Sequence, residues 1–276
     1  MFTLRKILLP VDFSDRSRGM APYAKAFASP FRSQLVLFHV EDSHRALRAE
    51  QTHQIKAQLE SFSSKEFQGL SAISELVEGD PATKIVEYAR AEQVDLIMMP
   101  TRGCGPYRRF LLGSQTAKVL HDSDCPIWTS VHADETLPTE SVSYRKIASA
   151  VDLGSHTEPV LLWASGLASA FDARLLVIHV TRSVEPIVAE ASMPDRQVEL
   201  VRCATEQLTD LVKKLKVQAE IVVGSGSVIE ETYNYAARFA ADLLIIGRHE
   251  AKGLAGRLNP HAYALIRESL CPVVSI

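Results

Sequence analysis

Short apolar runs rich in Val, Ile and Leu recur along the chain, separated by segments in which apolar residues have helical spacing. The runs are continuous rather than alternating, which is typical of strands buried on both faces of a sheet. Strands that alternate with helices predict a parallel sheet with right-handed crossovers. The predicted strands are 6–11, 34–40, 73–78, 94–99 and 126–131, then 147–151, 174–180, 218–223, 242–247 and 272–276. The helices predicted in the first half are 16–29, 43–68, 81–92 and 107–122.

The second half of the chain repeats the first. The matched segments are 6–12 and 146–152, 35–40 and 175–180, 91–97 and 239–244, and 125–127 and 271–273. We therefore predict two tandem domains, 1–138 and 144–276, joined by the polar, proline-containing segment 133–141. Each domain is expected to be an open, doubly wound α/β domain, with a five-stranded parallel sheet and helices on both faces.

The composition and charge of the chain disfavour several classes of protein. The chain has 276 residues, a net charge of −3 and 46% apolar residues, so nothing indicates a surface for nucleic acid or an anionic membrane. The first residues do not fit a signal peptide, and no apolar run is long enough to span a bilayer. The four cysteines lie far apart without a C-x-x-C pair, which favours reduced thiols. We expect a cytoplasmic protein.

The expected fold indicates where a ligand would bind. In open parallel sheets, ligands bind beyond the carboxyl ends of the strands, where the strand order reverses. If the first and fourth strands are neighbours, Asp12 and the loop that follows Met99 share one crevice. Gly113-Ser114 starts a helical pattern, and the N–H groups of a helix start suit phosphate. Two structural alternatives stay open: Gly113-Ser114 as a plain helix start, and Asp12 as the cap of the next helix.

Several short motifs occur in a fixed order along the chain. They are Val11-Asp12-Phe13-Ser14, Phe38-His39-Val40, Gly79-Asp80-Pro81, Asp95–Met99, Gly103 with Gly113-Ser114, and Cys125-Pro126-Ile127. As an ordered set they resemble the universal stress protein family, and the duplication resembles its tandem-domain members. That resemblance implies a stress-response function. It also implies a motif for ATP, G-x-x-G-x9-G-[ST], in the nucleotide-binding branch of the family.

The resemblance assigns site residues to the first domain. It implies that adenine and ribose meet Pro10, Val11 and Asp12, with Val40 against the base, and that ribose and phosphates meet Met99, Gly103, Gly113, Ser114 and Gln115. Pro100 stands in this set where the motif has its first glycine, and proline lacks an N–H donor. Arg108 and Arg109 lie between the glycines, either near a triphosphate or in solvent.

The second domain departs further from the motif. Glu250 stands in place of Gly103, and Pro260-His261 in place of Gly113-Ser114. A carboxylate repels phosphate and proline removes a helix-start donor, so we expect no ATP binding there in the family manner. By the resemblance, the final strands 127–131 and 273–276 pair within the chain as a pseudo-dimer, which leaves a further homodimer open.

Two functions fit these observations. In the first, ATP, alone or with Mg²⁺, is a regulatory ligand of the first domain and alters pairing with protein partners that the sequence does not name. In the second, the protein is a nucleotide-free interaction module of the stress response. The sequence shows no nucleophile–base pair, so the enzyme class stays open, with a slow ATPase as the upper bound. His39 and His179 lie in apolar runs and are expected to be packed core residues.

Overall fold

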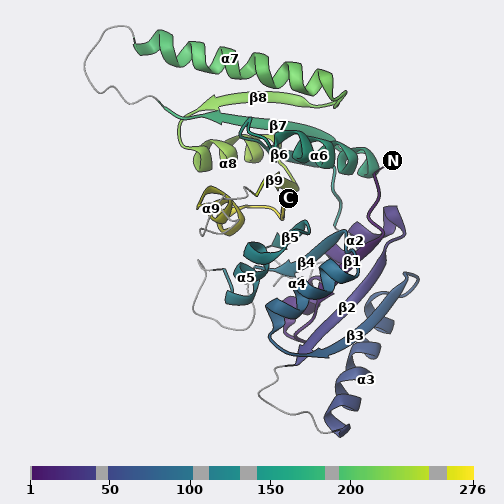
Figure 1. Ribbon diagram of the computed structural model, residues 1–276. Helices are drawn as coiled ribbons and strands as arrows, with labels where there is room; N and C mark the ends of the chain where they lie inside the picture. Colours follow the sequence, from purple (N-terminus) through teal and green to yellow (C-terminus); the bar gives the residue numbers. More distant parts are fainter. Residues whose placement is uncertain (1, 42–48, 102–111, 131–141, 184–192, 249–259) are drawn as a thin grey trace.

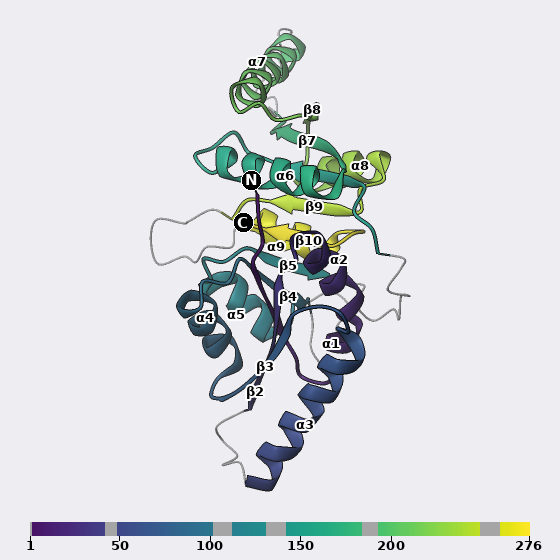
Figure 2. The same ribbon diagram turned by 90° about the vertical axis from the view of Figure 1, so that its right-hand side faces the viewer.

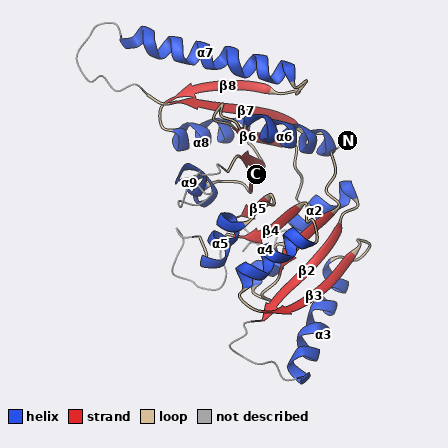
Figure 3. Ribbon diagram, viewed as in Figure 1, coloured by secondary structure: helices blue, strands red, loops and turns tan. Residues whose placement is uncertain are grey.

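The computed structural model describes residues 2–41, 49–101, 112–130, 142–183, 193–248 and 260–276. Its ten strands form one sheet (Figures 1 and 3). The strands of the first half are β1 (Lys6–Pro10), β2 (Gln34–Glu41), β3 (Ala72–Glu78), β4 (Leu96–Pro100) and β5 (Ile127–Ser130). Those of the second half are β6 (Lys146–Ala150), β7 (Arg174–Thr181), β8 (Glu220–Ser225), β9 (Leu243–Ile246) and β10 (Val273–Ser275).

The strand order is β3-β2-β1-β4-β5-β10-β9-β6-β7-β8. Within each half every pair of neighbouring strands is parallel, so the predicted five-stranded parallel sheets are confirmed. The order reverses between β1 and β4 in the first half and between β6 and β9 in the second. Each half therefore has the expected reversal of strand order between its first and fourth strands, which is where ligands bind in open parallel sheets.

Two of the helices predicted from the sequence differ from the described ones. The described helices are α1 (Asp15–Gly19), α2 (Ala21–Phe31), α3 (Ala49–Glu66), α4 (Pro81–Ala91), α5 (Ser114–Asp122), α6 (Thr157–Phe171), α7 (Met193–Lys214), α8 (Val228–Phe239) and α9 (Pro260–Glu268). The single helix predicted over 16–29 is wrong: α1 and α2 are separated at Met20. Pro22 has no N–H for the carbonyl of Arg18, so a new helix begins there.

Another predicted helix, 107–122, starts later in the described part of the chain. Leu112 and Gly113 are not helical, and α5 begins at Ser114. Residues 107–111 of that prediction lie outside the described residues.

Two hydrophobic layers cover the sheet, and both run through the two halves without a break. One holds apolar side chains of α2, α3, α6 and α7, and the other those of α4, α5, α8 and α9. Alternate residues of a strand face opposite layers: Ile7 and Leu9 belong to the first and Leu8 to the second. This double burial explains why the strands read as continuous apolar runs in the sequence.

The halves join through their last strands, as expected. β5 and β10 pair antiparallel, with Trp128 opposite Val274, and Figure 2 shows them in the middle of the molecule. On one face, the Phe2 ring at the start of the chain lies edge-on to Trp163 of α6. Gly166 of α6 makes room for that ring, since a Cβ there would lie 2.5 Å from it. The predicted pairing of the two halves within one chain is confirmed.

Arg248 ties the halves together on the other face of the junction. It follows β9 and is only 7% exposed, and its guanidinium donates to three carbonyl groups of the first half. Nη1 donates to Leu120 O and Ser123 O at 3.2 and 3.1 Å, and Nη2 donates to Cys125 O at 2.5 Å. These carbonyls lie at the end of α5 and just beyond it, where a helix leaves acceptors without intrahelical partners. The contact joins the second half to the helix that borders the first crevice.

Candidate functional site

The carboxyl ends of β1, β2 and β4 and the start of α5 meet at one end of the first half. Val11 N–H donates to Phe38 O at 2.9 Å, which holds the end of β1 beside β2. Gly113 N–H donates to Thr101 O at 2.8 Å, which holds the start of α5 at the end of β4. These contacts and the strand register place the described residues of the predicted site at the same end of the sheet: Pro10, Val11, Asp12, Val40, Met99, Pro100, Gly113, Ser114 and Gln115. Gly103, Arg108 and Arg109 lie outside the described residues.

Asp12 shapes the turn after β1. Its Oδ1 accepts from Ser14 N and Ser14 Oγ at 3.0 and 2.5 Å, and the intervening Phe13 has a φ of 59°. Ser14, not Asp12, caps α1, because Ser14 Oγ accepts from Ser17 N. The open alternative that Asp12 is the helix cap is thus resolved against it. Asp12 remains exposed at the end of β1.

The start of α5 has no side-chain cap. Gly113 is its N-cap residue, with an extended backbone (φ −60°, ψ 143°), and it makes no side-chain cap hydrogen bond. The N–H groups of that turn lack intrahelical acceptors, and they carry the positive end of the helix dipole. This helix start can therefore receive an anion beyond β4.

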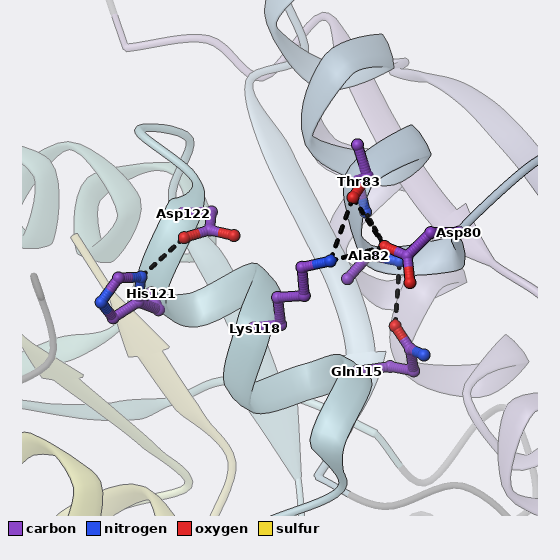
Figure 4. Close-up of polar contacts among 7 residues, drawn as sticks. All are labelled: Asp80, Ala82, Thr83, Gln115, Lys118, His121 and Asp122. Atoms are coloured by element: carbon purple, nitrogen blue, oxygen red, sulfur yellow. Dashed lines mark hydrogen bonds and ion pairs between the residues drawn. The ribbon is translucent and has the colours of Figure 1, made fainter.

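Three side-chain contacts fix α5 against α4 (Figure 4). Gln115 Oε1 accepts from Ala82 N at 3.0 Å. Lys118 Nζ lies 2.7 Å from Asp80 Oδ2 and 3.1 Å from Thr83 Oγ1. Asp80 is also the N-cap of α4 and accepts from Thr83 N at 3.0 Å. Gln115 thus contacts α4 in this structure, and Lys118, which the sequence analysis did not single out, positions the same helix.

The Lys118 ammonium and the Thr83 hydroxyl hold the pKa of Asp80 well below its usual range. A carboxyl with a lowered pKa in the folded state stabilises above its unfolded pKa, and this contribution is lost as the pH falls through the folded pKa. Asp80→Asn should therefore lower the urea midpoint at pH 7, and its deficit relative to the wild type should shrink below about pH 4. Urea unfolding at several pH values measures this, with Lys118→Met as the matched variant. A deficit that stays constant down to acid pH contradicts the ion pair.

Pro100 fits the sheet without disturbing it. On the side of β5, the ladder continues past Pro100 through Thr101 N–H, which donates to Ser130 O at 3.0 Å. Thr116 Oγ1 of α5 donates to Pro100 O at 3.0 Å. The missing N–H of Pro100 is therefore not needed in the ladder between β4 and β5.

The second half contains a pocket that is partly open to solvent at the equivalent position. A cavity of about 660 Å³ extends from the ends of β6 and β7 to the starts of α6, α8 and α9. Asp152 and Gly247 line it at the positions of Asp12 and Pro100. Ser269 N donates to Leu265 O at the end of α9, as Ser123 N donates to Val119 O at the end of α5. This offset of 146 makes Pro260 the counterpart of Ser114 and corrects by one residue the alignment expected from the sequence. Glu250 lies outside the described residues.

The two predicted core histidines have different surroundings. In both halves the ring Nδ1 donates to a carbonyl of the first strand or its end: His39 to Val11 O at 2.6 Å and His179 to Val151 O at 2.9 Å. His39 is buried. His179 is half-buried and lines the cavity, so the expectation of a packed core histidine is wrong for this residue.

Other chemistry is sparse in the part of the chain that the structure describes. It holds no group of three or more His, Cys, Asp or Glu arranged for a metal ion. Its cysteines, Cys125, Cys203 and Cys271, form no disulfide, and burial raises the pKa of Cys125 to about 12 and of Cys271 to about 11. None of its helices is long and apolar enough to cross a membrane.

The fold defines a tandem α/β protein whose two halves have the same strand order. The family model for the universal stress protein family matches residues 3–130 and 143–276, so the chain belongs to that family of stress-response proteins. It is 31% identical over 135 residues to a universal stress protein of Methanocaldococcus jannaschii, covering 45% of this chain and 79% of the relative. A universal stress protein of Thermus aquaticus is 31% identical over 133 residues, covering 45% of this chain and 96% of the relative.

A solved structure has the same arrangement over its full length. A universal stress protein from Archaeoglobus fulgidus superposes with a TM-score of 0.74 at 22% identity, covering 99% of this chain and 98% of the other. At that identity the likeness shows the fold.

Proposed function

We propose that the first half binds ATP, alone or with Mg²⁺, as a regulatory ligand in the stress response, and that the second half acts as its pseudo-dimer partner. The uncapped start of α5 at the end of β4 carries this proposal, because it offers backbone donors and a positive dipole end to phosphate. Asp12 at the end of β1 supplies an exposed carboxylate for ribose hydroxyls.

The family motif supports an ATP site at the start of α5. Gly113-Ser114 keeps the motif's helix start, and the hydrogen bond from Gly113 N to Thr101 O, at the end of β4, supports a phosphate site there. Pro260 at the start of α9 supplies no N–H at the corresponding position, so the proposal assigns ATP to the first half alone. The boundaries 1–138 and 144–276 remain our proposal for the two domains.

The first experiment is acid extraction of freshly purified protein, followed by chromatography for nucleotides and a calorimetric titration with Mg-ATP. We expect one ATP per chain. Asp12→Ala should weaken binding by roughly tenfold, since hydrogen bonds to a charged group contribute about 1.5–3 kcal/mol.

Asp152→Ala is the matched control in the second half and should leave the affinity unchanged. Equal loss in both variants would assign ATP to the wrong half. An empty extract and no binding up to millimolar Mg-ATP would favour the alternative, an interaction module without nucleotide, in which Pro100 has closed the site.

A further inference from the structure

The cavity of the second half has a chemistry of its own. Its apolar wall comes from both layers of the domain: Val160, Ile178, Val180, Val228, Ile246 and Leu265 all line it. Among the described residues that line it, five side chains are ionisable: His156, His179, Arg182 and His261 are basic, and Asp152 is acidic. Asp152 Oδ1 already accepts from Gly154 N at 2.8 Å and from Thr157 Oγ1 at 3.3 Å. An apolar wall with a basic side favours an organic anion that has an apolar body.

A comparison of His39 in the first half with His179 in the second indicates which anionic group the cavity would bind. In the first half, His39 Nδ1 donates to a carbonyl, and His39 Nε2 lies 3.3 Å from Glu41 Oε2. In the second half, His179 Nδ1 makes the same backbone contact, but Thr181 stands at the position of Glu41. The Thr181 hydroxyl donates instead to Gly224 O at 3.1 Å. Among the described residues, the second half thus keeps the histidine and has a threonine in place of its carboxylate.

A ligand with a carboxylate could supply in the second half the group that Glu41 supplies beside His39 in the first. When both ring nitrogens carry a proton, His179 can donate from Nδ1 to Val151 O and from Nε2 to a bound carboxylate. Arg182 also lines the cavity, where the sequence of the first half has Asp42, so a negative charge at the corresponding place becomes a positive one. We propose that the second-half cavity binds a carboxylic acid with an apolar body, its carboxylate taking the place beside His179 that Glu41 occupies beside His39.

This site is separate from the proposed ATP site and differs from it in chemistry. The first half presents Glu41 next to its histidine, and its α5 start carries Ser114. The second half presents Thr181 next to its histidine, and its α9 start carries Pro260. The proposal therefore concerns a ligand that is not a nucleotide.

The test uses octanoate as the probe and octanol as its uncharged analogue, each titrated calorimetrically into the full chain. Wild-type protein should bind octanoate at least about tenfold more tightly than octanol, the factor expected from a hydrogen bond to a charged group. Thr181→Glu installs the carboxylate of the first half beside His179 and should weaken octanoate binding by about tenfold or more, with little effect on octanol.

Thr181→Gln is the matched control, because it has the size of the glutamate variant without the charge, and it should keep the preference for octanoate. Thermal unfolding of both variants confirms that each is folded. Equal affinities of the wild type for octanoate and octanol would overturn the proposal. So would equal octanoate affinities of the Glu and Gln variants, or displacement of octanoate from its site by Mg-ATP.

Discussion

Arg248→Ala should lower the free energy of unfolding by about 3 kcal/mol, since it leaves several buried carbonyl groups without their donor. The guanidinium donates to Leu120 O, Ser123 O and Cys125 O, all of which belong to the other half of the chain. With the arginine truncated, the end of α5 loses its partners and the junction loses a contact across the sheet. Guanidinium chloride unfolding at neutral pH measures the change.

Thr101→Ala is the matched control for Arg248. Thr101 follows β4 as Arg248 follows β9, and each backbone N–H donates to the end of its half's last strand. The Thr101 side chain makes one contact within its own half, to Ser130 O at 3.1 Å. Its loss should cost about 1 kcal/mol. Equal effects of the two substitutions would show that the three contacts across the junction add no more stability than one hydrogen bond within a half.

Ser114→Pro should weaken ATP binding by about tenfold or more, the factor that corresponds to one hydrogen bond between a backbone donor and a charged phosphate. Ser114 is the first residue of α5, a position that tolerates proline, and Gly113 before it already has the extended backbone that a following proline requires. The substitution gives the first half the helix start of the second, where Pro260 begins α9.

Ser114→Ala separates the backbone from the side chain in that experiment. It keeps the N–H and removes the hydroxyl, so its affinity for Mg-ATP should stay well above that of Ser114→Pro. Calorimetric titration of both variants measures this, and thermal unfolding shows that α5 remains folded. If the two variants bind ATP equally, the N–H of Ser114 is not a phosphate donor.

Gly113-Ser114 and Gln115 show which features of the first site can be predicted from neighbouring residues in the sequence. The motif Gly113-Ser114 marks a helix start, and the structure has one there, because a helix start depends on neighbouring residues. The role of Gln115 depends on more than its neighbours. Its side chain accepts from Ala82 N, a residue 33 positions away, and no pattern around Gln115 contains that information.

The break between α1 and α2 at Met20 is a local feature that the pattern of apolar residues did not predict. The spacing of apolar residues from 16 to 29 fits one helix, and the structure has two. The signal was present in the sequence, since Pro22 cannot donate to the carbonyl four residues before it. Apolar periodicity reports which face is buried and does not by itself report a break in the backbone.

The sequence by itself determined the strands, the duplication and the family, because buried parallel strands must be continuously apolar and a repeated domain repeats its motifs. Only the tertiary structure decided what the second crevice contains. The sequence showed a degraded phosphate motif there, and the structure shows a cavity of about 660 Å³ with His179 on its wall. Cavities and long-range contacts such as that of Arg248 depend on segments far apart in the chain, and packing alone brings these together.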